Sequence, residues 1–301
     1  MSRIKVLHVV DAGDAHAAAH AAALRDHLDP ARFDASVAVA ASLRQLRRLF
    51  SEQRPDVVHA HSPKAGLRAR AAAKAAGVKK FIYTPHGFPA KRALLRVLER
   101  ALAPSRPHPA LRDPYLGAFP EPLPHDDIVV GSRGRMTPAR NPDAWVLLVQ
   151  RLTDSRNGVK CVWLGGGEGE AKARTDLTNM NLLMKVTVTG RLTDAESLEK
   201  MRGLDIFVRY SRAEASPEAL LEAMALGLPV VAADLPAHRD AVVNGDTGFL
   251  VNSEVELLER CQQLIDDAPL RRRLGAAARE RVRTEFSRER QLAELSRLYA
   301  A

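Results

Sequence analysis

Cysteine is scarce in this sequence, which contains two, Cys161 and Cys261, among 301 residues. The surrounding patterns predict a strand at the first and a helix at the second, far apart along the chain. We therefore expect buried thiols rather than a disulfide, as is typical of the reducing cytoplasm. The first residues lead directly into a predicted strand and lack the apolar block and cleavage site of a signal peptide. Both observations predict a cytoplasmic protein.

Long apolar runs and aromatic side chains are also missing. No apolar run approaches the roughly 18 residues that a helix needs to span a bilayer, so no transmembrane segment is predicted. Aromatic residues make up only 5% of the chain. Proteins that bind single-stranded nucleic acid interleave aromatic and basic side chains, because bases stack on the rings. The scarcity of aromatics therefore argues against nucleic-acid binding, which the isoelectric point near 9.9 would otherwise favour.

The excess of positive charge lies in the first part of the chain. Residues 1–125 contain 20 Lys and Arg against 10 Asp and Glu, whereas residues 126–301 contain 25 against 26. A basic half joined to a neutral half indicates that the first half meets something anionic. Anionic lipid headgroups, a phosphorylated acceptor and, less favoured, nucleic acid are the alternatives.

Strands and helices alternate along both halves, which is typical of parallel, doubly wound α/β sheets. A chain of 301 residues is long enough for two such domains. We predict an N-terminal domain over 1–103, a Pro-rich linker over 104–127, a C-terminal domain over 128–286 and a last helix over 287–301. The predicted helices are 15–27, 43–53, 67–76 and 91–103 in the first half and 195–202, 255–266, 270–285 and 288–299 in the second.

Residues 211–234 contain the most informative pattern. A strand, taken as the apolar run 204–210, leads into a loop and then a helix, with Pro217 in the first helical turn. The free N–H groups and the positive dipole end of such a turn make a site for phosphate. Two carboxylates flank this site, Glu214 on the loop and Glu222 on the second helical turn.

Two acids with seven residues between them across such a turn resemble the motif of the retaining glycosyltransferases of family 4, which have the GT-B fold. The segments LEAMALGLPVVAAD and VNGDTGFLV are similar to that family as well. The alternative is that Glu218 and Glu222 form a solvated helix face. The resemblance implies two Rossmann-like doubly wound domains that face each other across a cleft. In such enzymes the last helix often crosses back to the first domain.

The same resemblance implies catalytic roles for His86, Glu214, Arg135 and Arg140, and a donor-binding role for Glu222. In IVVGSRGRMTPARNP, Arg135 and Arg140 occupy the places where the family has an arginine and a lysine that neutralise the donor diphosphate. Fixed cations there lower the barrier, because negative charge grows on the leaving diphosphate. Glu222 would hold the ribose hydroxyls and Glu214 those of the donor sugar. His86, in YTPHGF, corresponds to the histidine that lies against the donor sugar.

Further donor contacts are expected from three loops. N–H groups near Ser216 would hold the diphosphate, and Glu218 is predicted to point away from it. The glycine-rich turn at 165–167 allows close approach of a nucleotide or is simply a tight turn, and the loop at 190–192 borders the nucleobase by resemblance. The predicted donor-binding residues beside Glu222 are Gly13, Ser216, Pro217, Glu218, Leu220, Gly165, Gly167, Arg191 and Leu192.

The first domain departs from the family. Gly13 stands alone where members often have a glycine pair, and further strands and helices are missing. The acceptor cleft is therefore open or is completed by a partner chain. Among the polar residues after the strands, His59 is expected to make ordinary hydrogen bonds at a strand end, whereas Lys64 either contacts the acceptor or is solvated. The helix 91–103, with a leucine side and many basic residues, suits core packing or an anionic membrane surface.

The sequence thus predicts a retaining glycosyltransferase that moves a sugar from a UDP- or GDP-sugar to a glycan or lipid-linked acceptor. It would act in the cytoplasm or peripherally at the inner face of the membrane. No Asp-x-Asp metal motif occurs in the chain, so we predict no metal site and no cofactor beyond the nucleotide-diphosphate sugar, which is the donor substrate. The alternative is a degenerate GT-B protein that binds a nucleotide sugar or a partner subunit without transferring sugar.

Overall fold

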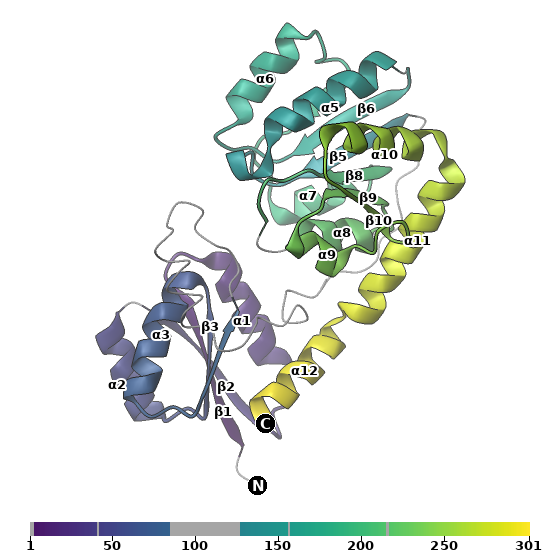
Figure 1. Ribbon diagram of the computed structural model, residues 1–301. Helices are drawn as coiled ribbons and strands as arrows, with labels where there is room; N and C mark the ends of the chain where they lie inside the picture. Colours follow the sequence, from purple (N-terminus) through teal and green to yellow (C-terminus); the bar gives the residue numbers. More distant parts are fainter. Residues whose placement is uncertain (1–2, 41, 85–126, 156, 215–216) are drawn as a thin grey trace. The chain divides into compact units, whose positions relative to one another are not determined.

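The computed structural model describes residues 3–40, 42–84, 127–155, 157–214 and 217–301. The chain divides into two units, the first comprising Met1–Pro114 with Ser287–Ala301 and the second Tyr115–Phe286. Each unit contains one parallel sheet flanked by helices (Figure 1), so the predicted α/β class is confirmed. The helix predicted at 91–103 and almost all of the predicted linker lie outside the described residues. In the described segments, no helix combines the length and apolarity needed to cross a membrane.

Unit 1 is built on a four-stranded sheet in the order β2-β1-β3-β4, in which all pairs are parallel. Side chains alternate between the two faces of each strand. On one face, Leu7 and Val9 pack with helices α2 and α3, and on the other, Val6 and Val57 pack with α1 and α12. The strands are β1 (Ile4–Asp11), β2 (Phe33–Ala40), β3 (Val57–His61) and β4 (Lys80–Thr84), and the helices are α1 (Ala15–His27), α2 (Leu43–Gln53), α3 (Pro63–Ala75) and α12 (Arg288–Ala300).

The last helix of the chain, α12, belongs to unit 1. The Ser287 side chain accepts a hydrogen bond from the Arg290 N–H and caps the helix start, as the sequence predicted. Leu295 and Tyr299 are buried in the same cluster as Val6 of β1. The unit therefore uses residues from both ends of the sequence to cover one face of its sheet.

Unit 2 is built on a six-stranded parallel sheet in the order β10-β9-β8-β5-β6-β7. The chain runs outward from β5 through β6 to β7, then returns to β8 and continues through β9 to β10. The direction of winding therefore reverses between the neighbouring strands β5 and β8. The strands are β5 (Ile128–Arg133), β6 (Val159–Leu164), β7 (Val186–Val188), β8 (Ile206–Arg209), β9 (Val230–Ala233) and β10 (Gly248–Val251).

The helices of unit 2 cover both faces of this sheet. One buried cluster joins Trp145 and Trp163 with residues of α10 and α11, and another joins Leu220 and Met224 of α8 with Val282 of α11. The helices are α5 (Pro142–Ser155), α6 (Glu170–Asn179), α7 (Asp194–Met201), α8 (Glu218–Ala225), α9 (Pro236–Ala241), α10 (Glu254–Asp266) and α11 (Ala268–Glu285), with a 3-10 turn η2 (Pro138–Arg140).

The structure differs from the sequence prediction in the bounds of two elements and in helices that were not predicted. Helix α3 begins at Pro63 rather than at residue 67, because proline is favourable in a first helical turn. The strand predicted as the apolar run 204–210 is β8, which ends on the charged residue Arg209. Helices α5, α6 and α9 were not predicted, the last of them because residues 235–242 were expected to form a loop.

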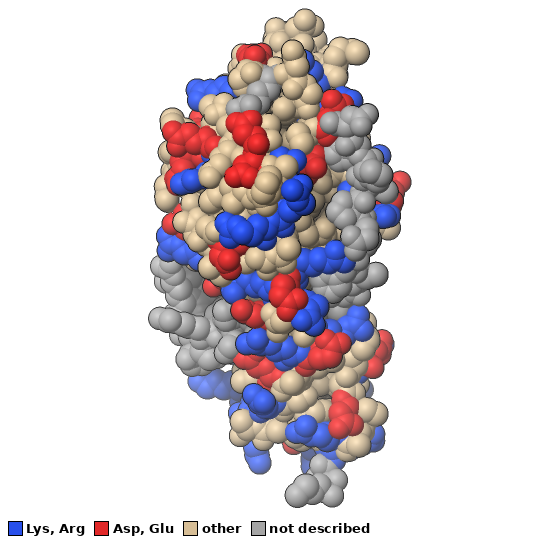
Figure 2. All heavy atoms as spheres, turned by 90° about the vertical axis from the view of Figure 1, so that its right-hand side faces the viewer, with Lys and Arg blue, Asp and Glu red and all other residues tan. Residues whose placement is uncertain are grey.

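The surface drawn in Figure 2 carries basic and acidic side chains interspersed, without a large area of one sign. On α11, for example, Arg283 pairs with Glu280 at 2.6 Å and Arg281 with Glu285 at 2.9 Å. Pairs of this kind at helical spacing neutralise one another locally. The face drawn therefore lacks the basic stripe that a nucleic-acid-binding protein presents.

Candidate functional site

The winding reversal in unit 2 places two arginines side by side at the C-terminal edge of the sheet. Arg133 is the last residue of β5 and Arg209 the last residue of β8. One terminal nitrogen of the Arg209 guanidinium donates a hydrogen bond to the main-chain carbonyl oxygen of Arg133. In open parallel sheets, ligands bind in the crevice at this kind of topological switch point. Both predicted acids lie beside these strand ends, Glu222 at Arg133 and Glu214 at Arg209.

Glu214 lies buried against this edge, with 2% of its side chain exposed. Its Oε2 accepts hydrogen bonds from Arg209 Nε at 2.9 Å and from Ser211 Oγ at 3.1 Å, and the carboxylate also forms an ion pair with Arg140. His238 Nε2 lies 3.7 Å from the same oxygen. Charge-assisted hydrogen bonds of this kind are strong, so they hold the Glu214 carboxylate in one position.

Arg209 is the most deeply buried cation of the site, with 5% of its side chain exposed. Burial lowers the pKa of its guanidinium well below the usual range, and the neighbouring charges of Arg140 and Arg133 lower it further. Removing a charge from water is costly unless a counter-charge is present. Glu214 supplies that counter-charge, and the two residues stabilise each other.

Glu222 pairs with Arg133 in a second group beside the first. The Arg133 guanidinium also donates to Ser197 Oγ at 2.7 Å and to Asp194 Oδ1 at 2.9 Å, both on α7. Burial lowers the pKa of Arg133, and the charge of Asp194 opposes this effect. Glu222 is more accessible than Glu214, with 27% of its side chain exposed. It is therefore the acid that a ligand can reach more readily.

Arg140 ends the 3-10 turn η2 and contacts Glu214 Oε2, the oxygen that Arg209 Nε also contacts. The backbone N–H groups of Arg212 and Ala213 donate to the carbonyl oxygen of Ala139 at 2.8 and 3.3 Å, which ties the Glu214 loop to this turn. Burial lowers the pKa of Arg140 to about 10, so the guanidinium still carries its charge at neutral pH. Arg133, Arg140 and Arg209 together form what we call the arginine cluster.

A third carboxylate, Glu218, acts on the arginine cluster. Burial is the largest influence on the pKa of all three arginines and lowers it, whereas the charge of Glu218 raises it. The Glu218 carboxylate is therefore within electrostatic reach of the cluster. The sequence prediction, in which Glu218 points away from the phosphate position, did not include this interaction.

The N-terminus of α8 lies on the loop that follows Glu214. Pro217 occupies the N-cap position, and its carbonyl oxygen accepts the first helical hydrogen bond from the Leu221 N–H at 2.9 Å. The N–H groups before Leu221 have no partner inside the helix. The Leu220 side chain is 1% exposed and belongs to the core, so only its backbone can serve a ligand. Ser216 lies outside the described residues.

The glycine-rich turn after β6 packs tightly on the loop after β5. A Cβ at Gly165, where φ is +134°, would lie 2.5 Å from the carbonyl oxygen of Gly134. At Gly167, where φ is +154°, it would lie 2.7 Å from the carbonyl oxygen of Met136. These glycines thus permit two loops to touch, and together they shape the segment that carries Arg135.

Replacing Gly165 by alanine should lower the unfolding free energy of unit 2 by about 2 to 4 kcal/mol. The new Cβ would clash with the backbone of Gly134, and alanine is strained at the positive φ of this position. Both tryptophans of the chain, Trp145 and Trp163, lie buried in unit 2. Their fluorescence during urea unfolding therefore reports on this unit. Gly203→Ala is the matched control, because its Cβ would meet only Lys200 O at an ordinary 3.7 Å. Equal midpoints for the two variants would contradict the packing argument.

The remaining predicted residues lie apart from these contacts. Arg135 and Arg191 are exposed, and Leu192 is half-buried against the core cluster of α8. Gly13 belongs to unit 1, where it follows β1 with φ of +85°. His86 lies outside the described residues. The structure thus brings together Glu214 with Arg140 and Glu222 with Arg133.

Sequence reasoning missed four residues of the site, and one of them had a visible signal. Arg209 is a charged residue at the end of an otherwise apolar strand, five positions before Glu214. A charged side chain within a buried strand needs a counter-charge. The short distance in sequence between Arg209 and Glu214 could have indicated that the two form an ion pair. Arg133 and Ser211 have no such signal, and His238 reaches Glu214 only through the tertiary fold.

These features define the class of protein. Two parallel-sheet α/β units with four and six strands make up the GT-B fold that the sequence predicted. The crystal structure of HepE from Anabaena in complex with UDP and glucose matches with a TM-score of 0.76 at 17% identity, over 99% of this chain and 100% of that one. The apo form of the lipopolysaccharide outer core galactosyltransferase WaaB matches with a TM-score of 0.76 at 14% identity, over 98% and 99%.

Family comparison is more specific. The glycosyl transferases group 1 model matches residues 118–281, which is more than half of the chain, and the Glycosyltransferase Family 4 model matches residues 3–119. The chain therefore belongs to the glycosyl transferases group 1 family, and the resemblance found in the sequence is confirmed.

Curated relatives match parts of the chain. The UDP-Gal:alpha-D-GlcNAc-diphosphoundecaprenol alpha-1,3-galactosyltransferase of Escherichia coli is 25% identical over 263 residues, 70% of this chain and 66% of that protein. A D-inositol 3-phosphate glycosyltransferase of Stackebrandtia nassauensis is 33% identical over 167 residues, 52% of this chain and 38% of that protein. The chain spans between 24% and 66% of the lengths of these and two further relatives.

Proposed function

We propose that this protein is a retaining glycosyltransferase that transfers a sugar from a nucleotide-diphosphate sugar, without a metal ion in the transfer step, to a glycan or lipid-linked acceptor. The observation that carries the proposal is the pairing of Glu214 and Glu222 with the arginine cluster at the switch point of unit 2. Membership in the glycosyl transferases group 1 family supports it.

Each part of the site has a chemical role in this proposal. Arg140, with Arg135 and the N–H groups that open α8, would bind the diphosphate. Glu214, held by Arg209, would accept hydrogen bonds from the donor-sugar hydroxyls, and Glu222 from the ribose hydroxyls. These carboxylates orient the donor so that its anomeric carbon is presented to the acceptor.

In the proposed transfer step, the arginines stabilise the negative charge of the leaving diphosphate. The bond between the anomeric carbon and the diphosphate oxygen breaks, and its electron pair leaves with the diphosphate. Fixed guanidinium groups stabilise the negative charge that grows there, which is the role that other enzymes give to a divalent ion. The acceptor oxygen bonds to the anomeric carbon from the same face, and its proton passes to the departing phosphate, so the configuration is retained.

The donor and acceptor classes are proposed from the relatives. The Escherichia coli relative is named for a UDP-sugar donor and a diphosphoundecaprenol-linked acceptor, and the HepE crystal contains UDP and glucose. A UDP-sugar is therefore the first donor to test, and a GDP-sugar the second. A lipid-linked acceptor also fits the basic first part of the chain, with 20 Lys and Arg against 10 Asp and Glu in residues 1–125.

The function is tested with a panel of UDP- and GDP-sugars, with binding measured by thermal shift and release of the nucleoside diphosphate measured with and without lipid-linked acceptors. We expect binding of one donor and acceptor-dependent release. Binding without release would favour the degenerate GT-B alternative. Absence of binding across the panel would remove the glycosyltransferase proposal.

Glu218 supplies a prediction about affinity. Its negative charge is within reach of all three arginines, so it competes with a bound diphosphate. Glu218→Gln should bind UDP or GDP roughly two- to fivefold more tightly, which corresponds to about 0.5 to 1 kcal/mol for a partly screened charge. Isothermal titration at low and high salt measures this, and the gain should shrink as salt rises. An unchanged or weaker affinity would show that the carboxylate does not face the diphosphate.

A further inference from the structure

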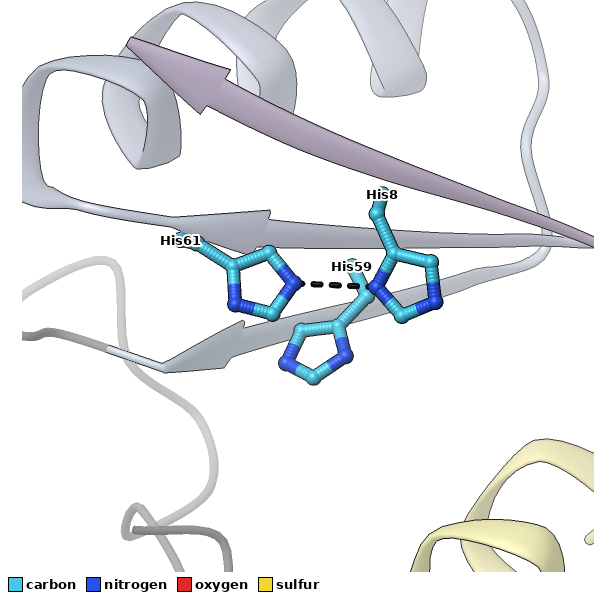
Figure 3. Close-up of side chains that lie close together, drawn as sticks. All are labelled: His8, His59 and His61. Atoms are coloured by element: carbon cyan, nitrogen blue, oxygen red, sulfur yellow. Dashed lines mark hydrogen bonds between the residues drawn. The ribbon is translucent and has the colours of Figure 1, made fainter. Parts of the chain in front are cut away.

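Unit 1 contains a group of buried histidines that the proposed transfer chemistry does not use. His8 of β1 and His59 of β3 are directly paired in the sheet, and His61 follows two residues later on the same face. Figure 3 shows the three rings gathered together, with His61 and His8 turned toward one another. All three side chains are completely buried, at 0% exposure. We call them the histidine cluster.

The ring nitrogens of the cluster lie close together. His8 Nδ1 and His61 Nε2 share a hydrogen bond at 3.0 Å, and the rings of His59 and His61 have centroids 4.1 Å apart. One ligand nitrogen from each of the three lies within 4.8 Å of the others. Three imidazoles around a tetrahedral Zn²⁺ have nitrogens about 3.4 Å apart, from a bond length near 2.05 Å. Side-chain rotations would be needed to bring the nitrogens of the cluster to that spacing.

Hydrogen bonding leaves one atom of the cluster unsatisfied. His8 Nε2 is buried and has no hydrogen-bond partner among the described residues. A buried polar atom without a partner is unfavourable, and such atoms in native proteins often lie beside an ordered water or an ion. The nitrogen of His8 that faces His61 is Nδ1, so the unsatisfied Nε2 lies on the other side of the ring from the His61 contact.

We propose that His8, His59 and His61 bind a divalent transition-metal ion, for which Zn²⁺ is the best candidate, as a structural site inside unit 1. Neutral imidazole is a ligand that zinc prefers. The ion would lie against the buried face of the unit 1 sheet and would link β1, which carries His8, to β3, which carries His59 and His61. The ion would lie in unit 1, whereas the acids and arginines of the proposed donor site lie in unit 2.

The surrounding residues have the arrangement that supports metal-binding histidines. His59 hydrogen bonds to Tyr299 Oη through Nδ1 and to Thr84 Oγ1 through Nε2, both at 2.7 Å. A ligating histidine binds the metal through one nitrogen while the other donates a hydrogen bond that fixes the ring. We expect His59 to bind the metal through Nε2 in place of Thr84 and to keep its Nδ1 hydrogen bond to Tyr299. His20, whose ring centroid lies 5.5 Å from that of His61, is the candidate for the fourth ligand.

The test uses the full chain without a histidine tag, stripped with a chelator and then dialysed against Zn²⁺. We expect about one zinc per chain by elemental analysis, and visible absorption bands of tetrahedral Co²⁺ when cobalt replaces zinc. Zinc should also slow hydrogen exchange in the peptides of β1 and β3, because binding to the native state suppresses local opening. That readout is independent of any transfer activity.

Variants separate the cluster from surface histidines. His8→Gln and His61→Gln should each weaken zinc binding at least 100-fold, whereas His27→Gln, an exposed histidine of the same unit, should leave it unchanged. If His8→Gln does not fold, Tyr299→Phe keeps all three rings and removes one supporting hydrogen bond. It should weaken binding by about tenfold or more.

Two results would overturn the proposal. One is the loss of all zinc from the wild-type chain on dialysis, with no protection of β1 and β3. The other is equal zinc retention by the wild type and by the folded cluster variants, including Tyr299→Phe. Either would leave the histidine cluster as a hydrogen-bond network only.

Discussion

Replacing Glu214 by glutamine is expected to lower the unfolding free energy of unit 2 by about 3 to 5 kcal/mol, because it leaves a buried cation without its counter-charge. Arg209, which is 5% exposed, donates to Glu214 Oε2 at 2.9 Å. The other residue that accepts from Arg209, among the described residues, is Arg133, through its neutral carbonyl oxygen. An amide at position 214 still offers an oxygen but no negative charge.

Urea unfolding followed by the fluorescence of Trp145 and Trp163 measures this effect. Glu259→Gln, an exposed acid of α10, is the matched control and should change stability by less than about 0.5 kcal/mol. The double variant Arg209→Met, Glu214→Gln removes both charges. It should be less destabilised than the sum of the single variants by about 1 to 3 kcal/mol, since contacting residues are coupled. A near-neutral Glu214→Gln variant would refute the buried ion pair.

The second large effect is expected on catalysis. Arg140→Gln should lower kcat by about 10²- to 10³-fold, which is the usual cost of removing one group that stabilises transition-state charge. Arg140 keeps its charge at neutral pH, since its pKa is lowered only to about 10. Its 28% side-chain exposure leaves it accessible to a ligand, unlike Arg209.

Two further variants identify the cause of that loss. Arg140→Lys keeps a cation where relatives in the resembled family carry lysine, and should retain far more activity than Arg140→Gln. Arg151→Gln, an exposed residue of α5, should behave as the wild type. If lysine and glutamine at position 140 reduce kcat equally while the unfolding midpoint is unchanged, the charge is not what the transfer step uses.

Most of the fold could be predicted because the signals are local. The bounds of α1 and α2 agree with the sequence prediction, since these alanine-rich or amphipathic runs begin at clear N-caps, Asp14 and Ser42. The α3 start was misplaced because Pro63 was read as part of a loop, although proline suits a first helical turn. The predicted domain boundaries remain predictions, as the segment at 85–126 lies outside the described residues.

The acids of the site could be predicted, but their partners could not. Glu214 and Glu222 lie in a segment whose sequence pattern predicts a strand, a loop and a helix in that order. Arg133 lies 89 positions before its partner Glu222 in the sequence, and it comes close to the acids because β5 pairs with β8. The electrostatic reach of Glu218 to the cluster likewise depends on the direction of side chains that sequence spacing does not specify.

The sequence by itself determined that two doubly wound α/β units form, because hydrophobic periodicity and turn residues act over a few positions. It also determined where the two acids stand relative to the start of α8. Only the tertiary structure decided that three arginines neutralise those acids, and that His8 meets His59 and His61 in one buried layer. These contacts arise from the order in which distant strands pair, and that order depends on the packing of the whole sheet rather than on any single segment.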